Sequence, residues 1–170
     1  FHYHVPTFGD GDYKKLAARV FLAADRAVDD GDWDLAATLG YIQLHEKVTP
    51  ERLNRVAANL LNGALAGDAD CMVAMAFFSD RLGLTVPNNP KTYLQWNELA
   101  AQNGNNEAHF VLGQAYLRGR GVPEATTKGL HHLRIAANLG CSDAALEIAL
   151  CFELGNGVEK DLVQSVEWFR

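Results

Sequence analysis

Residues 111–122, VLGQAYLRGRGV, end in a glycine-rich turn directly after a helical pattern, and such a turn could hold a phosphate. A P-loop binds phosphate through backbone N–H groups, a Lys and a Ser or Thr, and it follows a strand. This turn lacks the Lys and the hydroxyl residue, and it follows a helix. We therefore expect a helix-to-helix turn here, with no nucleotide or other cofactor bound.

Histidines are the next candidates for chemistry. His2 and His4 lie two residues apart near two aspartates, but no third and fourth metal ligand follows at a fixed spacing. His131 and His132 are consecutive, so on a helix their side chains point about 100° apart. His45 lies near a predicted helix end and has no nameable catalytic partner. We expect no metal site, and we expect His132 to pack against a neighbouring helix.

Acidic and thiol residues give no catalytic set either. The acidic runs at 29–34 and 68–70 lie at predicted helix starts, where N-capping is expected and the spacing of a calcium-binding EF-hand is absent. Cys141 and Cys151 are too far apart on one predicted helix to bond, and with Cys71 they are expected to be free thiols. No Ser/His/Asp or Cys/His set is apparent. The sequence thus favours a protein without catalytic residues, not an enzyme.

A period of 36 residues, the step from Ala108 to Ala144, places these residues in a wider pattern. The same step takes Tyr116 to Phe152 and takes the turn Gly-x-Gly-Val to its copy at 155–158. One column holds Trp96, His132 and Trp168. A repeat of this length is typical of stacked helical pairs.

The residue types of one repeat fit a pair of packed helices. Ala108, Leu112 and Tyr116 follow one another at four-residue spacing and form one stripe of a helix. Gly113 has no side chain, so a second helix can approach there. Gly119 and Gly121 follow the helix end, where a positive φ angle costs least for glycine.

This pattern, A-x3-LG-x2-Y-x2-G-x-GV and then A-x2-W-x3-AA-x2-G, resembles the Sel1-like repeat family. Residues 105–140 and 141–170 match it well, and 68–104 match it in the second helix only, because Asp80 stands where Tyr is expected. The resemblance implies an all-α fold, a right-handed superhelix of antiparallel helix pairs related to tetratricopeptide repeats.

We expect one helical-repeat domain over residues 1–170. It comprises an N-terminal helix at 12–30, a degenerate repeat at 31–67, and repeats at 68–104, 105–140 and 141–170, the last one incomplete. Thr49-Pro50 and Asn89-Pro90 are each expected to start a helix. Phe1 in place of an initiator Met indicates a processed form or a fragment.

Composition restricts the class of partner. Hydrophobic residues make up 48% and charged residues 21% of the chain, which is ordinary for a globular domain. A net charge of −6 argues against nucleic acid as the main partner. No apolar run approaches the roughly 20 residues that span a bilayer.

The resemblance implies that the first helix of each repeat lines a concave face that binds another protein. Ten residues of two such helices are predicted to face the partner: Glu107, Phe110, Gln114, Leu117, Arg118, Asp143, Leu146, Leu150, Glu153 and Leu154. Five of them are large apolar residues that we expect to be exposed.

Within the family, the resemblance admits an immunity protein that blocks a secreted effector such as a phospholipase. A repeat-containing hydrolase and an architectural segment of a longer scaffold are the alternatives. Export, for example to the periplasm, and a cytoplasmic location both stay open.

Overall fold

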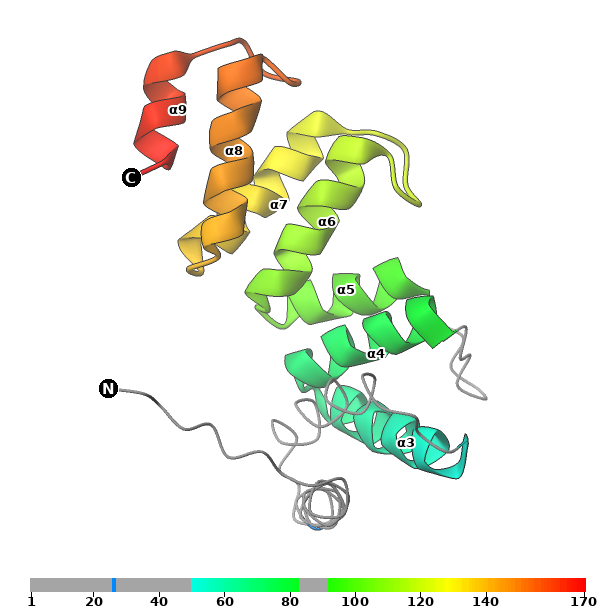
Figure 1. Cartoon of the computed structure of the whole chain (residues 1–170). Helices are drawn as coiled ribbons and strands as arrows, with labels where there is room; N and C mark the ends of the chain where they lie inside the picture. The colour runs from blue at the N-terminus through cyan, green and yellow to red at the C-terminus, as the bar shows by residue number, and fades with distance from the viewer. Residues whose placement is uncertain (1–25, 27–49, 83–91) are drawn as a thin grey trace, which may run out of the picture.

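The computed structural model describes residue 26, residues 50–82 and residues 92–170, and seven helices follow one another in the two longer segments (Figure 1). No strand occurs among these residues. The helices are α3 (Pro50–Ala66), α4 (Ala69–Leu82), α5 (Tyr93–Gln102), α6 (Asn106–Arg118), α7 (Thr126–Asn138), α8 (Ser142–Leu154) and α9 (Leu162–Trp168).

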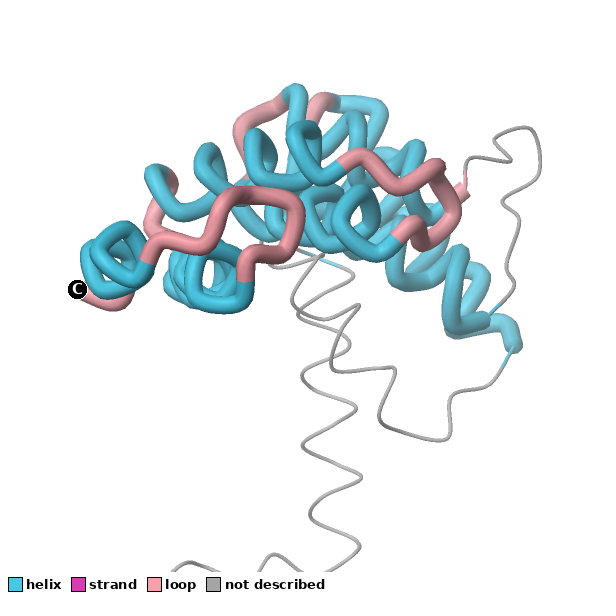
Figure 2. The backbone as a smooth tube through the Cα atoms, turned by 90° about the horizontal axis from the view of Figure 1, so that it is seen from above, coloured by secondary structure: helices cyan, strands magenta, loops and turns pink. Residues whose placement is uncertain are grey.

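Consecutive helices pack on one another, so the array grows in chain order from α3 to α9. Pairs α4–α5, α6–α7 and α8–α9 lie within the residue ranges predicted for the three repeats, and loops join the consecutive helices from α5 to α9 (Figure 2). The predicted all-α solenoid of helix pairs is confirmed. The expected helix at 12–30 and the expected repeat up to residue 49 lie outside the described residues, apart from the helical Arg26.

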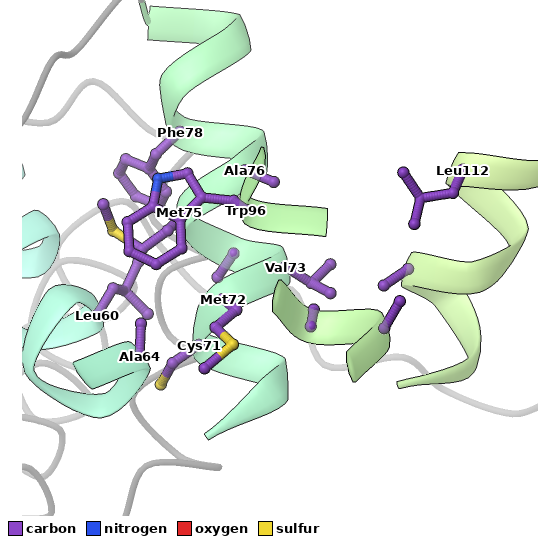
Figure 3. Packing of buried hydrophobic residues seen from close by; sticks show 14 residues of the cluster. Leu60, Ala64, Cys71, Met72, Val73, Met75, Ala76, Phe78, Trp96 and Leu112 are labelled. Atoms are coloured by element: carbon purple, nitrogen blue, oxygen red, sulfur yellow. The ribbon is translucent and has the colours of Figure 1, made fainter. Parts of the chain in front are cut away.

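Two hydrophobic clusters hold the array together. The first joins α3, α4 and α5, and its largest fully buried side chains include Leu60, Met75, Phe78 and Trp96 (Figure 3). Leu112 extends this cluster onto α6. The second cluster joins α7 and α8 through Leu130, Leu133 and Ile148. Each repeat therefore buries its apolar face against the next one, as expected for a solenoid.

The helix boundaries follow local capping chemistry. Helix α3 begins at Pro50, as predicted. Helix α5 begins at Tyr93, and the helix start predicted at Asn89-Pro90 lies outside the described residues. Thr92 and Gln95 form a capping box: the Thr92 hydroxyl accepts from the Gln95 N–H at 3.4 Å, and the Gln95 side chain accepts from the Thr92 N–H at 2.9 Å. This box satisfies two orphan groups and starts the helix there.

The register of α4 is also decided by capping. The Asp68 carboxylate accepts from the Cys71 N–H at 2.7 Å, and the Asn105 side chain accepts in the same way from Ala108 at 2.8 Å. Cys71 therefore takes the place of Ala108, which makes this repeat one residue longer than the period of 36. In this register Ser79, and not Asp80, corresponds to Tyr116 of the next repeat.

The predicted turn after α6 is confirmed. Gly119 and Gly121 have φ angles of 62° and 74°, in the left-handed region. Both are repeated 36 residues later by Gly155 and Gly157, with φ angles of 75° and 69°. The glycine-rich stretch is therefore a turn between two helices, and its glycines serve backbone conformation.

Candidate partner-binding face

Glu147 joins the first helices of two successive repeats. Its Oε1 accepts from Arg118 Nη2 at 2.6 Å, and its Oε2 accepts from Gln114 Nε2 at 3.1 Å. Gln114 and Arg118 lie one turn apart on α6, so both reach one carboxylate on α8. We call the surface of α6 and α8 that carries the ten predicted partner-binding residues the α6–α8 face. Glu147 is absent from that prediction, although it follows Asp143 by one turn.

The predicted residues differ in exposure. Leu146, Leu150 and Leu154 are 46%, 39% and 63% exposed. The four charged members of the set are also exposed, and the remaining three members are half-buried. The exposed charged members are Glu107, Arg118, Asp143 and Glu153, and the half-buried members are Phe110, Gln114 and Leu117.

The expectation that Phe110 and Leu117 are exposed is wrong. Both are half-buried and pack against the second hydrophobic cluster. They lie seven residues apart, about two turns, on α6. Leu117 lies against α7 of its own repeat, where a Cβ atom built on Gly129 would come within 2.8 Å of Leu117 Cγ. Leu146 holds the place of Phe110 one repeat later and is 46% exposed, with no further helix pair after α9 in the described residues.

Two positions of the face carry polar side chains on α6 and exposed leucines on α8. Leu150 and Leu154 occupy, one repeat later, the places of Gln114 and Arg118. The same positions are thus polar and bonded to Glu147 on α6, and apolar and exposed on α8. The face therefore joins a polar part on α6 to an apolar stripe on α8.

A cavity of about 570 Å³ lies between the repeat of α4–α5 and α6. Its polar wall includes Asp80, Tyr93 and Arg120, and Leu94 and Val111 supply apolar surface. Among the described residues, the side chains of Asp80 and Arg120 form no ion pair. One predicted partner-binding residue, Gln114, also lines this cavity.

A second cavity, of about 240 Å³, lies at the equivalent junction one repeat later. The pairs of equivalent lining residues are Asp80 and Leu117, Val111 and Glu147, Ala115 and Cys151, Arg120 and Asn156, and Gly121 and Gly157. Leu117 and the Arg118–Glu147 pair line the second junction, whereas Asp80 and Val111 hold the corresponding places in the first. The departure of the 68–104 repeat from the sequence pattern thus coincides with a larger cavity.

Acidic groups set the electrostatics beside the first cavity. Burial, and then the carboxylates of Asp80 and Glu107, raise the pKa of the Tyr93 hydroxyl, which stays neutral and able to donate a hydrogen bond. Burial and the nearby Asp70 carboxylate raise the pKa of Glu107. The cavity wall itself carries the Asp80 carboxylate and the Arg120 cation.

The described residues hold neither a metal site nor a membrane-spanning helix. No group of three or more His, Cys, Asp or Glu side chains there could hold a metal ion. None of the described helices is long and apolar enough to cross a bilayer. His132 packs against the first helix of its repeat, as predicted, because its ring stacks on Tyr116 with centroids 5.8 Å apart.

Helix pairs, glycine turns and junctions between repeats define the class of this protein as a helical-repeat solenoid. Residues 106–141 and 142–170 each match the Sel1 repeat, so the chain contains two Sel1 repeats and the resemblance seen in the sequence is confirmed. Sel1 repeats typically serve as protein–protein interaction modules.

Solved structures of other proteins share this fold. A Sel1 repeat protein from Oxalobacter formigenes has a TM-score of 0.72 and 21% identity, with 89% of this chain and 62% of that one covered. A protective antigen of uropathogenic Escherichia coli strains has a TM-score of 0.68 and 20% identity, with 91% of this chain and 36% of that one covered. This chain therefore spans less than two thirds of either relative. No curated protein sequence matches it.

Proposed function

We propose that the chain binds a partner protein on the α6–α8 face, which we expect to be the concave face of the solenoid. The observation that carries this proposal is the exposure of Leu150 and Leu154, at 39% and 63%, one turn apart on α8. Covering apolar surface with a partner removes it from water at a gain of roughly 25 cal/mol per Å². Adjacent exposed leucines therefore support a contact site.

Charged residues form the expected rim of this contact. Glu107, Arg118, Asp143 and Glu153 are exposed on α6 and α8, and the bond to Glu147 holds Arg118 in one place. A polar rim around an apolar centre is the usual anatomy of a protein interface. Phe110 and Leu117 are half-buried against the second hydrophobic cluster, so we expect them to contribute less to partner binding than the exposed leucines.

The binding site is tested with the double variant Leu150→Ser/Leu154→Ser. The control is Leu65→Ser, since Leu65 is 67% exposed on α3, far along the array from α8. Exposed side chains add little to stability, so both variants should melt within a few degrees of the wild type. The double variant should lose the partner and the control should keep it; equal binding by both would refute the site.

For the identity of the partner, we propose a secreted effector enzyme, such as a phospholipase, that the chain neutralises as an immunity protein. The support is the Sel1-repeat match together with an interaction face and a net charge of −6. The test co-expresses the chain with the effector encoded beside it and measures growth. Wild type and Leu65→Ser should rescue growth, and Leu150→Ser/Leu154→Ser should not.

Two other outcomes of that experiment would point elsewhere. Rescue by the double variant would mean that neutralisation does not use the α6–α8 face. No rescue by the wild type, combined with partner capture that needs Leu150 and Leu154, would favour an architectural segment of a scaffold over an immunity protein. Hydrolysis of a substrate by the chain alone would favour the hydrolase alternative.

A further inference from the structure

Two imidazoles meet between α6 and α7 in the central repeat. His109 Nδ1 lies 3.0 Å from His132 Nδ1, and the ring centroids are 5.2 Å apart at an interplanar angle of 37°. Both side chains are half-buried. At this distance one nitrogen donates a hydrogen bond and the other accepts it, which requires that the accepting nitrogen carry no proton.

The flanking repeats have no histidine at these two positions. Counting from the helix starts, His109 corresponds to Met72 before it and to Ala145 after it, and His132 falls in the column of Trp96 and Trp168. Met72 and Trp96 both belong to the first hydrophobic cluster, and Trp168 packs against the second. A pair that is apolar in both neighbours is therefore titratable only in the central repeat.

Neighbouring groups define the state of the pair. A backbone hydrogen bond with Ala101 of α5 raises the pKa of His109, against the larger lowering by burial. A neutral imidazole carries a single N–H, so in the neutral pair one Nδ1 carries the shared proton and the other accepts it. The first added proton can go to the Nε2 atom of the donating ring without breaking this bond. A second proton, on the accepting Nδ1, would place two donors and two positive charges face to face.

Other groups around the pair also oppose protonation. Burial is the largest cause that lowers the pKa of both His109 and His132. His131 lowers the pKa of both imidazoles, and His109 also lowers that of His132. His131 lies edge-on to His132, with centroids 5.9 Å apart. Lys128 lies 5.6 Å from the centre of the Tyr116 ring, which stacks on His132 from the other helix.

We propose that His109 and His132 form a pH-sensitive latch between α6 and α7, closed when the imidazoles share one hydrogen bond and opened by acidification. The direction follows from the lowered pKa values of the two imidazoles. In the unfolded chain they take up protons near pH 6.5, and in the folded chain they take them up only at a lower pH. The stability that the latch contributes is thus present above about pH 6.5 and is lost as the pH falls through the lowered folded values.

Opening the latch would also affect the surface residues that α6 carries. Helix α6 carries Gln114 and Arg118, whose bonds to Glu147 join the central repeat to the next one. Loosening α6 from α7 therefore disturbs the polar part of the α6–α8 face. The proposal stands whether or not that face binds the partner proposed above, because its measurements are made on the isolated chain.

The first test measures the melting temperature of the full chain between pH 8 and pH 5. The variant His109→Ala/His132→Trp copies the Ala145–Trp168 pair, and His109→Met/His132→Trp copies the Met72–Trp96 pair. Both should show a smaller fall on acidification than the wild type. His131→Gln, a change at the exposed neighbour, should keep most of the wild-type fall. Equal falls in the wild type and both double variants would overturn the proposal.

The second test does not require the double variants to fold, because it uses the wild type and single variants. Imidazole resonances of the wild type are followed by NMR from pH 8 to pH 5 and assigned with single His→Gln variants. His109 and His132 should titrate below pH 6.5 and respond to one another, so that replacing either one shifts the midpoint of the other. Two independent titrations at the ordinary value would overturn the latch, even if melting depended on pH.

Discussion

Gly113 of α6 lies directly against Leu133 of α7. A Cβ atom built on Gly113 would come within 2.7 Å of the Cγ and Cδ2 atoms of Leu133 and within 3.1 Å of the Gly129 carbonyl oxygen. Leu133 is fully buried and cannot turn away into solvent. The close approach of α6 and α7 thus depends on the absence of a side chain at residue 113.

Replacing Gly113 with alanine should therefore destabilise the fold by about 1–3 kcal/mol, the cost of overpacking a dense core. Helix propensity alone predicts the opposite sign, because alanine in a helix is favoured over glycine by about 1 kcal/mol. Urea unfolding of Gly113→Ala decides between them, and a more stable variant would contradict the close packing. In Gly113→Ala/Leu133→Ala the two losses should be less than additive.

The turn glycines allow backbone strain to be separated from packing. Gly121 has a φ angle of 74°, and a Cβ there would lie 2.9 Å from Leu94 Cδ1; Gly140 has a φ angle of 92° with nothing within 4 Å of its Cβ. Gly140→Ala should cost about 1 kcal/mol from the φ angle alone, and Gly121→Ala should cost more. Equal unfolding free energies for the two variants would show that the Leu94 side chain moves aside without a measurable cost.

The same turn gives a check on the phosphate alternative. Gly121→Val should destabilise the chain by at least about 1 kcal/mol and change no nucleotide affinity. Binding of ATP or GTP to the wild type, measured by calorimetry and abolished by this substitution, would instead restore the phosphate-loop interpretation.

The repeat spacing was sufficient to predict the fold because its signals are local. A four-residue stripe, a small residue at the helix contact and two turn glycines recur every 36 residues, as the helices α6 to α9 do. The register of α4 was not predictable in this way, because one extra residue shifts Cys71 into the place of Ala108. That shift becomes visible only through the caps at Asp68 and Asn105.

A buried and a half-buried residue of α6 should respond differently to truncation. Leu112 is 2% exposed, so Leu112→Ala should cost roughly 2–5 kcal/mol through lost burial and a cavity. Phe110 is half-buried against the second cluster, so Phe110→Ala should cost about 1–3 kcal/mol, more than a surface residue would. Chemical denaturation measures both, and a neutral Phe110→Ala would place that ring outside the core after all.

The candidate site was predicted only in part, since helix phase says which side of α6 a residue lies on but not what covers it. Phe110 and Leu117 pack against the second hydrophobic cluster, on α7 and α8, and no property of residues 106–118 alone reveals that cover. Leu150 and Leu154 were predictable as exposed because the repeat places Ile148 and Ala149, and not these two leucines, in the core. Glu147 needed the distance between two helices, which only the structure supplies.

The Arg118–Glu147 pair should orient the face more than it stabilises the fold. Its side chains are 40% and 20% exposed, which puts the ion pair in the range of about 0–1 kcal/mol. A double-mutant cycle with Arg118→Met and Glu147→Gln, read by thermal unfolding, should give a coupling energy in that range. A coupling of several kcal/mol would mean that the pair is a structural tie between the repeats.

The most direct test of the partner-binding face is site-specific photocrosslinking in the native cell. A photoreactive residue at position 154, where Leu154 is 63% exposed on α8, is compared with the same residue at position 65, where Leu65 is 67% exposed on α3. Similar exposure makes position 65 a matched control for random encounters. We expect one discrete crosslinked partner from position 154 and none from position 65, lost in a Leu150→Ser background. The same product from both positions, or from position 65 alone, would contradict binding on the α6–α8 face.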